Sequence, residues 1–232
     1  MNCKFCEAKC QKAGRQKNGQ QKLYCKACKK YQQGHYRYKA YKPEIIALIP
    51  KQKCESVGIR GAARILKIAN NTVLKHIKRI ANSIPKPPIP LNQQEFEVDE
   101  LRTFVGHKGN EYWVAYALNR STGEVVDYIV GKRSKRTLSM IINTLLLSEV
   151  KRIYTDNLTT YKSLIPKSIH SAGATLINHI ERRNLNLRTH LKRLSRKTIC
   201  FSRTKAMLDA CLRIYFWGSG INYPSAISTA SQ

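Results

Sequence analysis

Four of the eight cysteines in this 232-residue chain form two closely spaced pairs near its beginning. Cys3 and Cys6 make one Cys-x-x-Cys pair, and Cys25 and Cys28 make a second pair after eighteen residues. Two pairs at this spacing can place four thiolates around one tetrahedral zinc ion, whose binding would supply folding free energy to a segment with few aliphatic residues. Cys10 could replace Cys6 as one of the four ligands. The alternative to metal binding is that the two pairs serve redox chemistry or arise by chance. The spacing therefore predicts a structural Zn²⁺ site.

Acidic residues are scarce, so their positions are informative. The chain has 14 Asp and Glu against 42 Lys and Arg, a formal net charge of +28 that favours a nucleic acid as partner. Three of the four aspartates, Asp99, Asp127 and Asp156, lie in or at the end of predicted strands. Glu97, Glu100 and Asp127 are alternatives to Asp99 as the functional acid of this region. Asp127 could instead form a structural ion pair with a nearby lysine.

The elements around these acids follow from hydrophobic periodicity. Residues 96–130 are predicted to form an antiparallel meander of three strands. A helix follows, capped by Ser134, with Leu138, Ile141, Ile142 and Leu145 on its buried face. Next come a short strand ending at Asp156, a short helix, another strand and a long helix from about Asn178, whose buried stripe comprises Ile177, Ile180, Leu187, Leu191 and Leu194. This order is typical of an α/β ribonuclease-H-like layout.

In that layout, carboxylates of the first and fourth strands lie side by side, and a carboxylate from a later helix completes the cluster. Three carboxylates held together repel each other unless cations lie between them. Two Mg²⁺ ions about 3.5–4 Å apart would relieve this repulsion and clamp the attacking and leaving oxygens of a phosphodiester. Hard oxygen ligands favour Mg²⁺ or Mn²⁺ over zinc.

Residues 43–82 have a helical pattern that indicates a helix-turn-helix. We expect Pro50 to kink or end the first helix, and Asn70 or Asn71 to cap the last one. Val73, Ile77 and Ile80 form its apolar stripe. The residues predicted to contact DNA lie on the other face: Thr72, Lys75, His76, Lys78 and Arg79. A plain helical hairpin with solvated lysines is the alternative.

The chain is thus predicted to be multidomain. The domains are an N-terminal zinc ribbon at 1–42, an all-α helix-turn-helix at 43–82, a proline-rich linker at 83–94, an α/β ribonuclease-H-like catalytic domain at 95–223 and a disordered tail at 224–232. Without an apolar run near the ~20 residues that span a bilayer, we expect no membrane association and a cytoplasmic, nucleoid-associated protein.

Two sequence segments carry a resemblance to a known family. YTDN around Asp156, and HIERRNLNLRTHLKRLSRKTICFSR from His179, resemble the insertion-sequence-one (IS-one) family of bacterial transposases, in the DDE superfamily. FEVDE around Asp99 matches that family's first acid, and the resemblance covers residues 1 to about 223. It implies a catalytic triad of Asp99, Asp156 and Glu181 that holds the Mg²⁺ ions.

The resemblance also implies a function. Such a transposase binds the inverted-repeat ends of a mobile element, cleaves DNA strands and transfers the 3′ ends to target DNA. Its expected partners are double-stranded DNA and further copies of itself, at least a dimer, because two ends must be held together. Further residues expected to contact DNA phosphates are Arg182, Arg183, Arg188, Lys192 and Arg193. One alternative is a non-enzymatic DNA-binding regulator in which the domain at 95–223 is degenerate. The other is a general ribonuclease-H-like nuclease.

Overall fold

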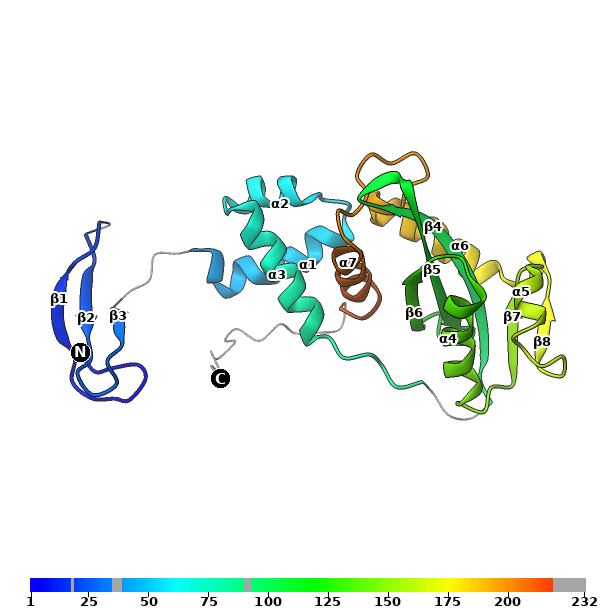
Figure 1. Ribbon diagram of the computed structural model, residues 1–232, viewed down its shortest axis with the longest axis horizontal. Helices are drawn as coiled ribbons and strands as arrows, with labels where there is room; N and C mark the ends of the chain where they lie inside the picture. The colour runs from blue at the N-terminus through cyan, green and yellow to red at the C-terminus, as the bar shows by residue number, and fades with distance from the viewer. Residues whose placement is uncertain (18, 35–38, 90–92, 219–232) are drawn as a thin grey trace. The chain divides into compact units, whose positions relative to one another are not determined.

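The computed structural model describes residues 1–17, 19–34, 39–89 and 93–218 (Figure 1). The chain divides into two compact units, Met1–Lys42 and Pro43–Gln232. The predicted helix-turn-helix, linker and catalytic domain therefore all fall within the second unit. The predicted tail at 224–232 lies outside the described residues. Among the described residues, no helix combines the length and apolar character needed to cross a membrane.

The first unit is built on a small antiparallel sheet of three strands in the order β1-β2-β3. These are β1 (Gln11–Arg15), β2 (Gln21–Tyr24) and β3 (Tyr31–Gln33), followed by the 3-10 turn η1 (Lys39–Tyr41). Its buried apolar cluster consists of Leu23 and three cysteines, Cys3, Cys10 and Cys25. Because so little surface is buried, this core by itself is too small to stabilise a folded unit.

Three helices begin the second unit: α1 (Pro43–Cys54), α2 (Ile59–Leu66) and α3 (Asn70–Ser83). The predicted apolar stripe of α3 is confirmed, since Val73, Ile77 and Ile80 are all buried. Lys67, in a left-handed conformation with φ 53°, ends α2 and turns the chain sharply toward α3.

One expectation for these helices is wrong, and so is one of the two alternatives for Pro50. Pro50 does not end the first helix, because α1 continues to Cys54. Both Ile49 and Pro50 are buried, and this packing offsets the hydrogen bond that proline cannot donate. Asn70 and Asn71 do not cap α3, since Ala69 occupies the cap position without a side-chain bond. Backbone amides of the first turn donate instead to the Ala69 carbonyl oxygen.

The rest of the second unit contains a five-stranded sheet in the order β6-β5-β4-β7-β8. Its strands are β4 (Glu95–Val105), β5 (His107–Asn119), β6 (Val125–Gly131), β7 (Arg152–Thr155) and β8 (His170–Ala172). The predicted meander is confirmed, because β4, β5 and β6 pair antiparallel. Strand β7 pairs parallel with β4, and β8 pairs parallel with β7.

Helices cover both faces of this sheet: α4 (Lys135–Leu146), α5 (Thr159–Lys162), α6 (Asn178–His190) and α7 (Lys205–Trp217). Phe96 and Val98 of β4 face the cluster that contains the α4 and α5 side chains. Leu101 of β4 and Tyr116 of β5 face the cluster that contains α6 and α7. The predicted cap is confirmed, since Ser134 Oγ accepts a bond from the Thr137 N–H. The predicted order of strands and helices is also confirmed.

Helix α6 is shorter than the predicted long helix. It ends at His190, and the chain continues into the 3-10 turn η3 (Lys192–Leu194). All five residues of the predicted buried stripe are buried, but Leu191 and Leu194 lie beyond the end of the helix. The Arg188 guanidinium donates to the Leu194 carbonyl oxygen at 3.2 Å and holds this turn against the helix.

Helix α7 lies between the helices α1 and α3 and the sheet (Figure 1), and its side chains contribute to two cores. Leu208 and Leu212 pack in the cluster of the sheet and α6. Cys211 and Ile214 pack in the cluster of α1, α2 and α3, beside Ile77. A helix with apolar side chains on two faces is buried on both. The helical segment and the sheet are therefore joined through α7.

Candidate active site and metal centres

The strand register brings two of the predicted acids together. The parallel pairing of β4 and β7 ends with Val98 opposite Thr155, so Asp99 is the next residue on β4 and Asp156 is the first residue after β7. Asp99, Glu100 and Asp156 each offer a carboxylate oxygen, and these oxygens all lie within 4.8 Å of one another. The cluster lies where the antiparallel part of the sheet meets its parallel part, at the carboxyl end of β7.

Hydrogen bonds fix the orientation of Asp99. Its Oδ2 accepts from Asn184 Nδ2 at 2.6 Å, and Asn184 Oδ1 in turn accepts from the Tyr116 hydroxyl at 2.9 Å. Burial raises the pKa of Asp99, and the nearby charges of Asp156 and Glu181 raise it further, although the Asn184 bond opposes them. Asp99 is therefore held in place by α6 in a surrounding that would favour a cation.

Glu100 is the acid that the sequence analysis kept only as an alternative to Asp99. Its side chain is 1% exposed, and the Nε of Arg133 lies 3.6 Å from its Oε1. Burial raises the pKa of Glu100 to about 7; Arg133 opposes this shift, while Asp99 and Asp156 add to it. Side chains of consecutive strand residues lie on opposite faces of a sheet. Beyond Val98, however, β4 has no paired β7 residue at this edge. The side chains of both Asp99 and Glu100 can therefore reach the space just past the end of β7, where Asp156 lies.

Asp156 is held by the turn that follows β7. Its Oδ1 accepts a hydrogen bond from the Leu158 N–H at 3.0 Å, directly before α5 begins. Thr155, the last residue of the strand, is fully buried. This carboxylate is therefore fixed by local structure at one end and by the β4–β7 pairing at the other.

Glu181 lies in the first turn of α6 and is exposed. Among the described residues it is not part of the group whose oxygens lie within 4.8 Å. It is nevertheless close enough for its charge to raise the pKa of Asp99. The structure thus unites Asp99 with Asp156 and places Glu181 nearby.

Glu97, another alternative, joins β4 to the start of α6. It is fully buried and accepts from the Ile180 N–H at 2.8 Å. His179 Nδ1 lies 2.6 Å and Arg120 Nε 3.5 Å from its Oε1. These contacts fix the helix turn that carries Glu181, which is a structural role.

Asp127 lies on β6, away from the acid cluster. Its Oδ1 lies 2.7 Å from Lys86 Nζ. The lysine pairing that the sequence analysis kept open is therefore the arrangement found, and Asp127 ties residues 84–89 to the sheet.

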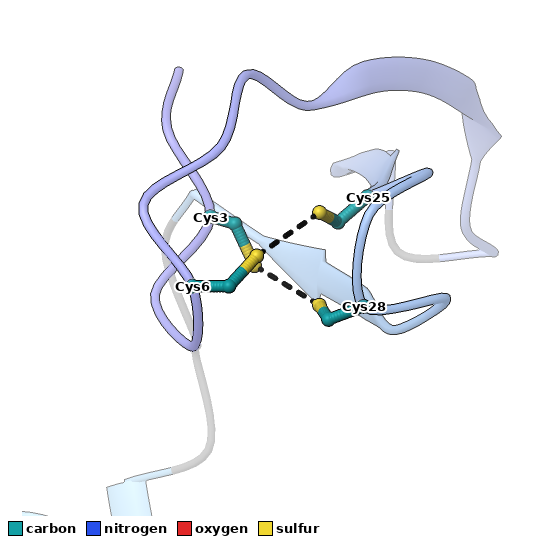
Figure 2. A group of neighbouring side chains, drawn as sticks. All are labelled: Cys3, Cys6, Cys25 and Cys28. Carbon is teal, nitrogen blue, oxygen red and sulfur yellow. Dashed lines mark hydrogen bonds between the residues drawn. The ribbon is translucent and has the colours of Figure 1, made fainter.

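The four predicted zinc ligands also come together (Figure 2). The Sγ atoms of Cys3, Cys6, Cys25 and Cys28 lie within 4.8 Å of one another, with Cys3 3.5 Å from Cys28 and Cys6 3.4 Å from Cys25. Cys10 is buried beside them but lies outside this group, and its Sγ accepts from Gln32 Nε2 at 3.2 Å.

The predicted DNA-contacting face of α3 is found only in part. Lys75 and Lys78 are exposed, and Thr72 and Arg79 are half-buried. The assignment of His76 to this face is wrong, because His76 is 2% exposed. Positions 73, 76, 77 and 80 share one side of a helix, so His76 lies on the buried stripe.

The predicted phosphate contacts on α6 and η3 fall into two groups. Arg182 and Lys192 are exposed. The other three are partly buried and contact the fold: the Arg183 guanidinium lies 5.9 Å from the centre of the Tyr215 ring, Arg188 donates to Leu194, and Arg193 donates to Ser202 Oγ at 2.5 Å.

An acid cluster on a mixed sheet, preceded by a helical segment and a cysteine cluster, defines the class of DDE transposases when combined with the sequence matches. A family model described as IS1 transposase matches residues 95–217, and one described as the InsA C-terminal domain, a helix-turn-helix, matches residues 36–81. This chain belongs to the IS1 transposase family. Membership implies transposition, DNA binding and a nuclease or transferase activity.

Curated relatives agree with the family assignment. Insertion element iso-IS1n protein InsB of Shigella dysenteriae is 41% identical over 108 residues, which cover 47% of this chain and 82% of the relative. Insertion element IS1 protein InsB of Shigella flexneri is 35% identical over 51% of this chain and 91% of the relative. Insertion element IS1 2 protein InsB of Escherichia coli (strain K12) is 34% identical over 51% of this chain and 71% of the relative.

Proposed function

We propose that residues 95–217 form a ribonuclease-H-like catalytic domain that cleaves DNA and transfers the freed 3′ ends to target DNA. One observation carries this proposal: Asp99 on β4 and Asp156, directly after the parallel strand β7, come side by side, within 4.8 Å of each other and of Glu100. Ligands of open α/β sheets bind outside the carboxyl ends of parallel strands, where the topology changes.

The acid cluster fits divalent cations. Its oxygens are close together, and burial raises the pKa of both Asp99 and Glu100, so the ionised cluster is unfavourable without a positive charge. Carboxylate oxygens are ligands that suit Mg²⁺ or Mn²⁺. We assign Asp99, Asp156 and Glu181 as the acids that hold two such ions, with Glu100 as an additional carboxylate. When bound, the ions would stabilise the charge on the attacking and leaving oxygens.

The chain's own residues position this site. Asn184 holds the Asp99 carboxylate, and the Leu158 N–H holds Asp156. Glu97 fixes the first turn of α6 and thereby the place of Glu181. The exposed Arg182 on the same turn contacts DNA phosphates close to the acids.

Two in-line displacements at phosphorus take place at this one site. In the first, water attacks the phosphodiester at the element end, the new P–O bond forms, and the element's 3′ oxygen leaves as a hydroxyl. In the second, that hydroxyl attacks a phosphodiester of the target, and a target 3′ hydroxyl leaves. No covalent bond to the protein is needed, and the number of phosphodiester bonds is unchanged by the second step.

The cysteine-containing first unit and the helical segment α1 to α3 bind the ends of the mobile element. Four thiolates around one point, in a unit with almost no apolar core, suit a structural zinc ion held by Cys3, Cys6, Cys25 and Cys28. We assign Lys75 and Lys78 of α3 to double-stranded DNA, together with Thr72 and Arg79 at the edge of the same face. Because two element ends must be held together, the active form is at least a dimer.

The decisive experiment replaces Asp156 with Asn. Nicking of a duplex that carries the element end should fall by at least about a thousandfold, roughly 4 kcal/mol in activation free energy, in Mg²⁺. DNA affinity measured in Ca²⁺ should stay within about twofold of the parent. The matched control is Glu124→Gln, an exposed acid in the turn before β6, which should cut like the parent.

Unchanged nicking by the Asp156→Asn protein would contradict the site assignment. DNA binding without any cleavage by the parent protein would indicate the non-enzymatic regulator instead. Cutting of unrelated DNA at the same rate, without strand joining, would indicate a general nuclease.

A further inference from the structure

A cleft lies beside β4, just past the acid cluster. On β4, only Glu95–Val98 pair with β7. The remainder of that edge of β4 borders the segment that follows α6. Two contacts connect them: the Thr103 hydroxyl donates to the Arg193 carbonyl oxygen at 3.3 Å, and Val105 bridges to Ser202. Between the strand and this segment is a cleft of about 280 Å³.

Four guanidinium groups line this cleft. The described residues around it are Arg102, Thr103, Phe104, Arg188, Arg193, Ser195 and Arg196, and none of these is acidic. Within the part of the chain that the structure describes, one of the four has a carboxylate partner: Arg102 Nη2 lies 2.6 Å from Oε2 of Glu111, a residue that does not line the cleft. Arg188 and Arg193 are tied to the fold by single bonds to Leu194 and Ser202, which leave other N–H groups of each guanidinium to bind a ligand.

The positive charges are crowded. Burial lowers the pKa of Arg188, and the charge of Arg196 lowers it further, while the carboxylate of Asp99 opposes both. A half-buried cation beside a second cation is unfavourable unless an anion balances them. Planar guanidinium groups of arginines that line one cleft suit the tetrahedral oxygens of a phosphate, which they can bind through paired N–H donors.

We propose that this arginine cleft binds a backbone phosphate of the DNA strand that is being cut. Arg102 follows Asp99 by three residues on the same strand, which corresponds to about 10 Å. A DNA strand advances by about 3.4 Å per nucleotide, so the bound phosphate lies within about three nucleotides of the scissile one. Arg188 lines the cleft, and its pKa responds to the charges of both Arg196 and Asp99, so the cleft and the acid cluster are neighbours.

The identity of the strand rests on the proposed function, whereas binding of a phosphate to the cleft does not. The site would set the distance between the held phosphate and the reacting one, and so would position the cleavage site. Positioning of this kind contributes to catalysis by holding the reacting atoms in line.

The test uses the full chain and inorganic phosphate, followed by NMR of the arginine Nε–Hε groups. We expect the signals of Arg102, Arg188, Arg193 and Arg196 to shift along one saturable curve. Arg196→Ala should weaken phosphate binding at least tenfold. The control is Lys197→Ala, which removes an equal charge from the neighbouring exposed position outside the cleft, and it should change binding by less than twofold.

A second arm identifies the source of the phosphate. A 20-base-pair duplex without terminal phosphates should displace inorganic phosphate from the parent protein. If the duplex binds while phosphate stays in the cleft, the site serves a free anion and the proposal is overturned. It is also overturned if the four signals shift independently, or if Lys197→Ala weakens binding as much as Arg196→Ala.

The Asp156→Asn protein separates this inference from the proposed function. It should bind phosphate like the parent, because the cleft does not include the acid cluster. Loss of cleavage with intact phosphate binding would support both the acid site and a separate cleft. Intact cleavage with intact phosphate binding would contradict the acid assignment alone, whereas loss of phosphate binding in this protein would overturn the cleft as a separate site.

Discussion

The cysteine cluster and the acid cluster form in different ways. The four cysteines meet within one small unit, because each pair is local and only one chain reversal separates the pairs. Asp99 lies on β4 and Asp156 directly follows β7, and a helix and two further strands intervene between β4 and β7 in the chain. Their meeting depends on the parallel register of β4 and β7. Local spacing can therefore reveal the first cluster, whereas only the assembled sheet creates the second.

The two units also differ in what stabilises them. The first unit has a buried cluster of four residues, three of which are cysteines. The second has three apolar clusters, two of which share helix α7. We therefore expect metal binding to dominate the stability of the first unit and apolar burial to dominate that of the second.

The largest expected effect is on the first unit. Cys25→Ser, or a chelator, should abolish its folding, because structural zinc contributes an apparent ~10–16 kcal/mol in small zinc-binding peptides. Metal analysis should find about one zinc per parent chain and none in the variant. Amide NMR should show that the second unit is unchanged. Cys200→Ser, at an exposed cysteine, is the control, and a metal-free but folded first unit would remove the contrast between the units.

The next largest effect separates the two carboxylates that flank Asp99 and Asp156. Glu181→Gln should reduce cleavage by at least about a thousandfold, or ~4 kcal/mol, as expected for a member of the triad. Glu100→Gln should reduce cleavage by about tenfold and raise the Mn²⁺ concentration needed to fill the metal site. Titration with Mn²⁺, followed by electron paramagnetic resonance, measures this metal binding independently of cleavage. If the order of the two effects is reversed, Glu100 is the third acid and Glu181 is secondary.

A smaller effect tests the role of α7. Leu212 is fully buried, and Leu212→Ala should lower the free energy of unfolding of the second unit by about 2–5 kcal/mol. Because α7 belongs to both cores, the helical segment and the sheet should unfold in one urea transition. Leu147, which is 84% exposed, provides the matched control, and Leu147→Ala should change stability by less than about 0.5 kcal/mol. Separate transitions for helices and sheet would show that α7 does not couple them.

The smallest effect concerns a buried cation in α1. Lys53 is 3% exposed and donates to the Val57 carbonyl oxygen, and burial lowers its pKa to about 8. Lys53→Met should raise the free energy of unfolding near pH 7 by about 1–2 kcal/mol, after the lost hydrogen bond is subtracted.

This gain should depend on pH. Since the folded-state pKa of Lys53 is lower than the ordinary value of 10.5, unfolding takes up a proton between about pH 8 and 10.5. The parent therefore becomes more stable as the pH rises through this window, and the advantage of the Lys53→Met protein over the parent should shrink. Urea unfolding at several pH values measures this, with the exposed Lys51→Met as control. A constant difference would show that the lysine is not a buried charge.

Errors in the sequence analysis have two origins. The residue type of His76 favours the DNA-contacting face, although its spacing from Val73 and Ile80 places it on the buried stripe. The alternative that Pro50 ends α1 is wrong, because burial of the surrounding residues allows the helix to continue. In the sequence analysis Glu100 is an alternative to Asp99, because strand alternation places consecutive side chains on opposite faces of a sheet. In the structure both belong to the acid cluster. For Pro50 and Glu100 the surrounding structure outweighs the local rule, whereas for His76 the helical spacing is a better guide than the residue type.

Several features were determined by the sequence alone. The cysteine spacing, the three-strand meander, the Ser134 cap and the buried faces of α3 and α4 depend on contacts a few residues apart or on simple periodicity. The structure decided that Glu100 joins Asp99 and Asp156, that α7 serves two cores, and that arginines from β4 and from α6 with its following turn line one cleft. The physical reason is that each of these requires segments distant in the chain to meet, and strand register and helix packing set those meetings.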